Sequence, residues 1–277
     1  MVKHFMLNLF TALLLGGVFF LNGCNIDLLG LFGSTDLNDR LAERNNFIFL
    51  TEDKRTLSLG DEYSFIVLTD THIENGNAHG LEKIKNVIEG SDENIEFVVI
   101  VGDITQYGSA QDLQLFIDIA DSFELPCYPV IGNHDIFFSN WPEWKKMIGS
   151  TSYRINGDEI TLFIMDSANA YFGNDQLNWL ERELKSASGR IFVFSHANLF
   201  VNNLTEIQQF TDTKERARII SILRDKCDIM FMGHSHQGSI NKAGNTLYIG
   251  MEDFKSKKTY CIVSVSITGV SYKFEKL

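Results

Sequence analysis

Cysteine and positive charge are both scarce in this sequence. Among 277 residues there are 4 cysteines, and 24 lysines and arginines face 36 aspartates and glutamates, which gives a formal net charge of −12. Because phosphate backbones are bound by basic surfaces, this balance argues against a nucleic-acid polymer as partner. It does not exclude a small anionic substrate, since bound divalent cations reverse the local field.

The cysteines are too scattered for a thiolate metal site. Cys24, Cys127, Cys227 and Cys261 lie far apart in the sequence, whereas zinc–thiolate sites use neighbouring pairs. If Cys24 is modified, three cysteines remain, and an odd number cannot all pair within one chain. These three lie in or beside apolar stretches, so we expect free, buried thiols.

The first residues have the pattern of an export signal. Lys3 and His4 precede an apolar run over Phe5–Leu21, and the sequence Leu-Asn-Gly-Cys ends at Cys24. This end resembles the lipobox of bacterial lipoproteins. The resemblance implies a signal peptide over residues 1–23, acylation of Cys24, and a protein anchored to a bacterial membrane outside the cytoplasm, in the periplasm or at the cell surface. An uncleaved membrane anchor is the alternative.

Two further parts follow Cys24. Residues 24–61 mix polar and short apolar runs, which predicts a tether with some local structure, including a helix over Asp36–Arg44 and a strand at Phe47–Leu50. Over residues 62–277, short apolar runs alternate with segments of helical period, as in a single domain of strands and helices. Its main predicted strands are Tyr63–Thr69, Phe97–Val101, Cys127–Ile131, Ile191–Phe194 and Asp228–Met232.

A polar block follows each of these five strands. The blocks are Asp70-Thr71-His72, Gly102-Asp103, Gly132-Asn133-His134-Asp135, Ser195-His196 and Gly233-His234-Ser235-His236. They contain five of the seven histidines in the chain. Ligand sites in open α/β sheets gather outside the carboxyl ends of the strands, so we expect the five blocks to converge.

These residue types are those of a site for two metal ions. The carboxylates of Asp70 and Asp103, the amide of Asn133 and several imidazoles supply mixed oxygen and nitrogen ligands, which suit manganese, iron or zinc. The two oxygens of Asp103 can bridge a pair of cations, and such a pair clamps a phosphoryl group and activates a bridging water. His134 beside Asp135 has the form of a general acid held by its neighbour.

The ordered set resembles the pattern D-x-H, G-D, G-N-H-[DE], H and G-H-x-H of the calcineurin-like metallophosphoesterases, from about Tyr63 to Gly250. The resemblance implies a four-layer αββα sandwich of two mixed β-sheets flanked by helices. It further implies His134 as the catalytic acid oriented by Asp135, and two metal ions, one on Asp70, His72, Asp103 and His236 and the other on Asp103, Asn133, His196 and His234.

Smaller features narrow the branch of the family. Purple acid phosphatases carry a tyrosine ligand three residues past the bridging aspartate, where this chain has Gln106, and protein phosphatases carry an acidic residue and an arginine soon after G-D. The stretches Gly102–Gly108 (GDITQYG) and Leu125–Asp135 (LPCYPVIGNHD) are similar to the bacterial cyclic-nucleotide phosphodiesterase-like branch. One departure is that Ala197 follows His196, where many relatives soon have a proline.

The sequence therefore predicts a dinuclear metallophosphoesterase that hydrolyses a phosphodiester or phosphomonoester with a metal-bridging hydroxide and with His134 as general acid. Its expected partners are a small phosphoester substrate and, through Cys24, a membrane. The alternatives are a phosphomonoesterase or nucleotidase, and a surface lipoprotein that binds metal without catalysis.

Aromatic residues directly after the third block are candidates for shaping the substrate site. Phe137, Phe138, Trp141 and Trp144 either form a wall of the site or pack this segment onto the sandwich. Asp166, after another apolar run, either supports the site from behind or is a turn residue.

Overall fold

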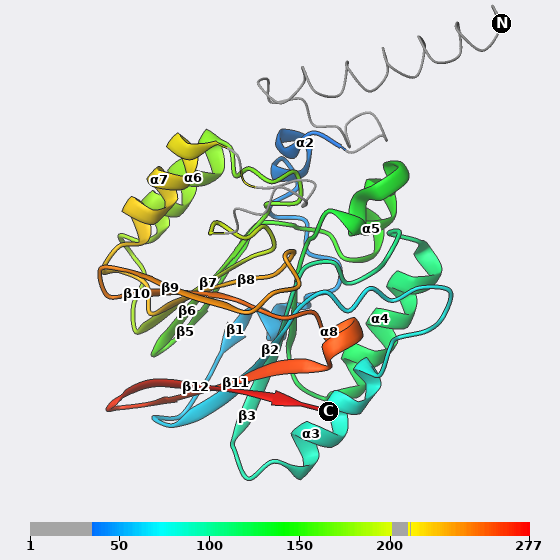
Figure 1. Ribbon diagram of the computed structural model, residues 1–277, viewed down its shortest axis with the longest axis horizontal. Helices are drawn as coiled ribbons and strands as arrows, with labels where there is room; N and C mark the ends of the chain where they lie inside the picture. The colour runs from blue at the N-terminus through cyan, green and yellow to red at the C-terminus, as the bar shows by residue number, and fades with distance from the viewer. Residues whose placement is uncertain (1–34, 201–209, 211) are drawn as a thin grey trace, which may run out of the picture.

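Two mixed β-sheets form the centre of the fold (Figure 1). The computed structural model describes residues 35–200, 210 and 212–277. The seven-stranded sheet has the order β1-β5-β6-β7-β8-β10-β9, and the five-stranded sheet has the order β12-β11-β2-β3-β4. The strands are β1 (Thr56–Leu57), β2 (Tyr63–Leu68), β3 (Ile95–Val101), β4 (Cys127–Val130), β5 (Tyr153–Gly157), β6 (Ile160–Met165), β7 (Arg190–Ser195), β8 (Ile229–Met232), β9 (Ser239–Ala243), β10 (Thr246–Gly250), β11 (Thr259–Ser266) and β12 (Gly269–Lys276).

Helices cover the outer faces of both sheets (Figure 1). Two lie over the seven-stranded sheet, namely α6 (Asn174–Glu183) and α7 (Thr213–Leu223), and two lie over the five-stranded sheet, namely α3 (Ile84–Gly90) and α4 (Ala110–Ser122). The predicted αββα sandwich is therefore confirmed. Shorter helices are α2 (Leu37–Leu41), α5 (Trp141–Met147) and α8 (Phe254–Lys257), with 3-10 helices at Glu52–Arg55, Leu81–Lys83 and His134–Ser139.

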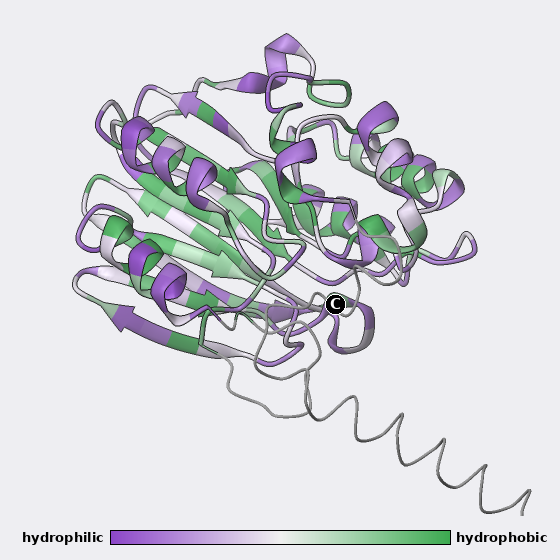
Figure 2. Ribbon diagram, turned by 90° about the horizontal axis from the view of Figure 1, so that it is seen from above, coloured by the Kyte–Doolittle hydropathy of each residue, from purple (hydrophilic) through white to green (hydrophobic). Residues whose placement is uncertain are grey.

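The main core lies between the two sheets, where Figure 2 shows apolar strands inside a more polar shell of helices. All six residues of β2 are buried, because a strand covered on both faces needs apolar side chains throughout rather than in alternation. The ring of Phe65 lies 4.5 Å from that of Phe97 in the same sheet and 5.0 Å from that of Phe192 in the other sheet. A second apolar cluster fills the space beneath α6 and α7.

The segment before β2 belongs to the folded domain. Leu37 and Leu50 are buried, and β1 pairs in parallel with β5. The fully buried Arg40 donates to both carboxylate oxygens of Asp166, at 2.7 and 2.9 Å. The sequence predicted a tether with some local structure over residues 24–61. Within residues 37–57 the structure has several buried side chains, held by contacts such as that of Arg40 with Asp166, which is 126 positions away in the sequence.

All five polar blocks follow strand ends at one edge of the sandwich. β2, β3 and β4 run parallel in one sheet, and β7 and β8 run parallel in the other. The three later cysteines are free and buried, as expected. Within the described residues, no helix has the length and apolar character that crossing a membrane requires. The predicted signal peptide and Cys24 lie outside the described residues.

Candidate metal centre

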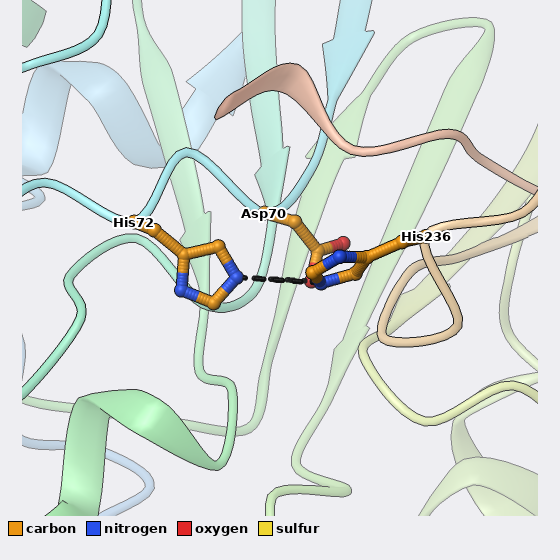
Figure 3. A group of neighbouring side chains, drawn as sticks. All are labelled: Asp70, His72 and His236. Carbon is orange, nitrogen blue, oxygen red and sulfur yellow. Dashed lines mark hydrogen bonds and ion pairs between the residues drawn. The ribbon is translucent and has the colours of Figure 1, made fainter. Parts of the chain in front are cut away.

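Imidazoles and carboxylates from both sheets meet at this edge. Their potential ligand atoms form three overlapping groups, each with all atoms within 4.8 Å of one another: Asp70, His72 and His236; His72, Asp103 and His134; and Asp103, His196 and His234. Figure 3 shows the first group, with His72 and His236 reaching Asp70 from two different loops. The convergence that strand-end positions predicted is present in the structure.

The backbone is strained at this centre. Asp70, His72, Asp103, His234 and His236 have φ values of 53°, 45°, 48°, 68° and 54°, in the left-handed region. Left-handed conformations of non-glycine residues cost of order 1–3 kcal/mol each and persist only where the surroundings impose them. Five such residues in one cluster indicate that the fold accepts a conformational cost in the backbone in order to place these side chains.

Glycines let the strand ends approach one another. Gly102 has φ of 82°, and a Cβ there would collide with the ring of His196. A Cβ at Gly132 would collide with the backbone nitrogen and Oδ1 of Asp103. These glycines allow the close approach, because any larger residue would push the strand ends apart.

The Asp70 carboxylate presents one free oxygen to two imidazoles. Its Oδ2 accepts a hydrogen bond from the Thr69 hydroxyl at 2.6 Å and from the His234 backbone N–H at 3.1 Å. Its Oδ1 is buried without a hydrogen bond among the described residues, and it lies 3.1 Å from Nε2 of His236 and 3.7 Å from Nε2 of His72. These two Nε2 atoms are 3.4 Å apart. A buried oxygen that faces two imidazole nitrogens fits a cation well.

Asp103 lies between the two halves of the centre. Its Oδ2 is 3.2 Å from Nε2 of His196 on one side and 3.8 Å from Nε2 of His72 on the other. Its Oδ1 accepts the backbone N–H of His134 at 2.9 Å. Burial raises the pKa of Asp103, but the nearby histidines, His196 foremost, outweigh it and hold that pKa below its usual range. The carboxylate therefore stays charged and within reach of both groups.

His196 is oriented by the backbone of the neighbouring strand. Its Nδ1 lies 3.0 Å from the carbonyl oxygen of Val101, so an Nδ1–H donates there and Nε2 is left for a ligand role. Asn133 Oδ1 lies 3.1 Å from that Nε2 and 3.0 Å from Nδ1 of His234. Burial lowers the pKa of His196, but the Asp103 carboxylate outweighs this effect and raises that pKa to about 10. Such nitrogen and oxygen donors fit a second first-row cation beside the first.

His134 is held by Gln106. Its Nδ1 lies 2.9 Å from the backbone oxygen and 3.0 Å from the side-chain Nε2 of Gln106. Its Nε2 is 3.9 Å from Asp103 Oδ2 and so faces the cluster. Burial lowers the pKa of His134. The Gln106 side chain is itself positioned by Lys255, whose Nζ lies 3.3 Å from its Oε1 and 2.8 Å from Glu74 Oε1.

Asp135 has a different place from the one the family resemblance implied. Its carboxylate accepts the backbone N–H groups of Thr105 at 2.8 Å and Gly132 at 2.9 Å, the Thr105 hydroxyl at 2.9 Å and the Ile104 N–H at 3.3 Å. Asp135 thus ties the second block to the third, and Gln106 rather than Asp135 orients His134. Burial, followed by the charge of Asp103, raises the pKa of Asp135 to about 7.

Sequence reasoning gave no role to Gln106 or Lys255. Gln106 lies in the stretch GDITQYG and marked a departure from other branches, which was a usable signal. Lys255 is 149 positions from Gln106 and belongs to no recognised block. Asp166 proved to be the partner of Arg40.

The aromatic residues after the third block divide into two pairs. Trp141 and Trp144 are buried, which is the packing alternative. Phe137 is half-buried beside His134, with ring centroids 4.3 Å apart, and the side chain of Phe138 is 61% exposed. Phe137 and Phe138 therefore lie at the edge of the site, where they could contact a substrate.

Comparisons with known proteins agree with this geometry. The family described as Calcineurin-like phosphoesterase matches residues 63–238. A curated protein of Fibrobacter succinogenes, named as a probable cyclic nucleotide phosphodiesterase, is 22% identical over 218 residues, which are 71% of this chain and 80% of that protein.

Solved structures have the same fold. A dimetal phosphatase from Danio rerio matches with a TM-score of 0.61 and 13% identity, over 76% of this chain and 95% of that one. A purple acid phosphatase from yellow lupin (Lupinus luteus) seeds matches with a TM-score of 0.63 and 12% identity, over 79% of this chain and 52% of that one.

The chain belongs to the calcineurin-like phosphoesterase family. It is a hydrolase that acts on phosphoester bonds, in a family that generally depends on two metal ions.

Proposed function

We propose that the protein is a dinuclear phosphodiesterase for a small substrate. The observation that carries this proposal is Asp103, whose single Oδ2 lies 3.2 Å from His196 and 3.8 Å from His72, in two different ligand groups. A carboxylate in that position could contribute to holding both cations. The preference for a diester is supported by the relative named as a probable cyclic nucleotide phosphodiesterase.

The proposed ligand assignment is the one that the family resemblance implies, and the side-chain groups described above support it. The first cation would be held by Asp70, His72, Asp103 and His236, and the second by Asp103, Asn133, His196 and His234. Manganese, iron and zinc all suit these nitrogen and oxygen donors. When bound, two such cations would polarise a phosphoryl group and lower the pKa of a water molecule between them.

The protein's own contribution to the chemistry is proton transfer and orientation. His134 presents Nε2 to the cluster while Gln106 holds Nδ1, so a protonated ring delivers its proton at Nε2 to the leaving oxygen of the substrate. Thr69 holds one oxygen of Asp70 and thereby aims the other at His72 and His236. Asp135 fixes the loops that carry Asp103 and His134.

The test compares hydrolysis of bis(p-nitrophenyl) phosphate and p-nitrophenyl phosphate by metal-stripped protein before and after addition of manganese, iron or zinc. We expect metal-dependent diester cleavage that is lost in Asp103→Asn, together with two metal ions bound per chain. A preference for the monoester would replace the diesterase by a phosphomonoesterase or nucleotidase. Absence of bound metal in the wild-type protein would refute the dinuclear site.

We also propose that the protein is a lipoprotein held outside the cytoplasm by acylation of Cys24, which the lipobox-like sequence Leu-Asn-Gly-Cys supports. The wild-type protein should fractionate with membranes and carry acyl chains, and Cys24→Ser should release it or leave its signal peptide uncleaved. Unchanged membrane association and processing in Cys24→Ser would contradict the anchor.

A further inference from the structure

Exposed aromatic rings lie beside the metal centre. Among the described residues, the large apolar side chains that stand most exposed near the third block are Phe138, at 61%, and Tyr107, at 42%. With the half-buried Phe137 they form a row of rings, which we call the aromatic platform (Tyr107, Phe137 and Phe138). Neither the assigned ligands nor the proton transfer of His134 makes use of this row.

The platform begins at the catalytic imidazole and continues away from it. The centroid of the Phe137 ring is 4.3 Å from that of His134. The Phe138 ring follows at 6.1 Å from Phe137, and the Tyr107 ring lies 6.1 Å from Phe138. These spacings are within the range of aromatic contacts. A molecule whose leaving oxygen is next to His134 is therefore within reach of the platform.

The backbone holds the platform in place. Phe138 and Ser139 both have left-handed backbones, with φ of 54° and 65°. The Asn140 side chain donates to the Tyr107 backbone oxygen at 2.7 Å, and the Asn140 N–H donates to the Phe137 carbonyl at 3.1 Å. Left-handed phenylalanine is rare because its side chain adds strain. The chain therefore maintains an unfavourable conformation that keeps an apolar ring in water.

We propose that the aromatic platform is a binding subsite for a flat aromatic group on the leaving side of the substrate, such as a nucleobase. This inference rests on the proposed function, and it deepens it by naming the part of the substrate that the protein selects. Open ring faces favour a planar group, because stacking needs only a face, whereas a flexible alkyl chain needs an enclosing groove.

The test uses two substrates with the same scissile bond, adenosine 3′,5′-cyclic phosphate and ribose 3,5-cyclic phosphate, which lacks the base. The measured quantity is the ratio of their kcat/KM values with the metal-loaded full chain. Phe138→Asn removes the ring and retains a residue that tolerates a left-handed backbone. We expect it to lower the ratio roughly tenfold, as for the loss of one base-stacking ring. Phe138→Trp, which keeps an aromatic ring at this position, should retain the wild-type ratio.

A matched control is Phe274→Ala on β12, an exposed phenylalanine in the five-stranded sheet, which should leave the ratio unchanged. A loss in Phe138→Asn that is equal for both substrates would overturn the inference, as would a loss specific to a short-chain phospholipid diester.

A binding measurement separates failure of the subsite from failure of the proposed function. Adenosine 5′-monophosphate should bind the wild-type chain more tightly than ribose 5-phosphate, and Phe138→Asn should remove the difference. If Phe138→Asn removes the difference in binding while no diester is cleaved, the diesterase proposal is refuted and the platform proposal is supported. If diesters are cleaved but the base affects neither binding nor the ratio of kcat/KM values, the platform proposal is refuted and the diesterase proposal is supported.

Discussion

The general-acid candidate is held by an amide rather than by a carboxylate. Because the Gln106 backbone oxygen carries no formal charge, it stabilises the protonated form of His134 less than an aspartate would. Burial then lowers the pKa of His134, which makes its protonated form a stronger acid toward the leaving oxygen. Lys255 and Glu74 keep the amide in position from outside the cluster.

Replacement of Gln106 by alanine should reduce catalysis without removing metal. In the protonated ring, Nδ1–H donates to the backbone oxygen of Gln106, which remains in Gln106→Ala. The imidazole then loses only the packing of the Gln106 side chain against it, and we expect kcat to fall by up to roughly tenfold, part of the usual contribution of a general acid. Metal content, measured by elemental analysis, should stay at the wild-type value. Gln114→Ala, an exposed glutamine on α4, is the control; a variant Gln106→Ala with wild-type kcat would exclude the positioning role.

At the scale of elements, strand ends and their glycines bring the two sheets to one site. Gly102 follows β3, and its left-handed backbone lies against the His196 ring. His196 follows β7 of the other sheet, so the contact joins the two sheets at the metal centre. The close approach is possible only without a Cβ.

Gly102→Ala should therefore damage both stability and metal binding. We expect a loss of at least about 1–2 kcal/mol from the left-handed backbone alone, with a further loss of metal as the His196 ring is displaced. Urea denaturation and metal content measure the two effects. Gly60→Ala is the matched control because a Cβ there meets nothing within 4 Å. Unchanged metal content in Gly102→Ala would refute the role given to this contact.

Helix α2 is attached to the sandwich by the buried ion pair of Arg40 and Asp166. Arg40→Met leaves the carboxylate buried and unpaired, for which we expect a loss of about 3–5 kcal/mol of stability. Asp166→Asn added to this variant should recover part of the loss. Lys145→Ala breaks an exposed ion pair with Glu43 of the same segment and should cost at most about 1 kcal/mol. Equal effects of the two single variants in denaturation would contradict this account.

At the scale of the whole molecule, the fold buries the carboxylates of Asp70 and Asp103 beside histidines. Without metal, Asp70 and Asp103 are balanced by protonated histidines. The pKa of His196 is raised from 6.5 to about 10 chiefly by Asp103, against the effect of burial. A group whose pKa is raised by folding stabilises the protein below its unfolded pKa, and this contribution is lost as pH rises through the folded pKa.

The metal-free protein should therefore become less stable between pH 6.5 and 10. Asp135, with a pKa raised from 3.8 to about 7 by burial and then by Asp103, acts in the same direction at lower pH. Bound metal should raise Tm and flatten its pH dependence, because a metal-ligating imidazole is already neutral. Tm measured from pH 6 to 10 with and without manganese tests this. An equally steep decline in metal-free His196→Gln would assign it to other groups.

Much of the site could be predicted because its signals are local. A strand such as β2 is apolar apart from Ser64, and its polar block follows soon after, so Asp70 and His72 could be placed at a strand end from the sequence. The contacts of His134 could not be, because a sequence neighbour such as Asp135 can point away from it and bind other loops. The packing of residues 37–57 could not be predicted for a similar reason, since Arg40 has its partners, Asp166 and Asn169, in the segment after β6.

The sequence by itself determined the strands, the order of the polar blocks, the family and the kinds of ligand atom available. These depend on patterns within a few residues, where side-chain chemistry and backbone preference act directly. The tertiary structure alone decided that Gln106 holds His134, that Arg40 pairs with Asp166, and that Phe138 is exposed beside the site. These depend on how two sheets pack and on strained backbones that only the assembled core can hold.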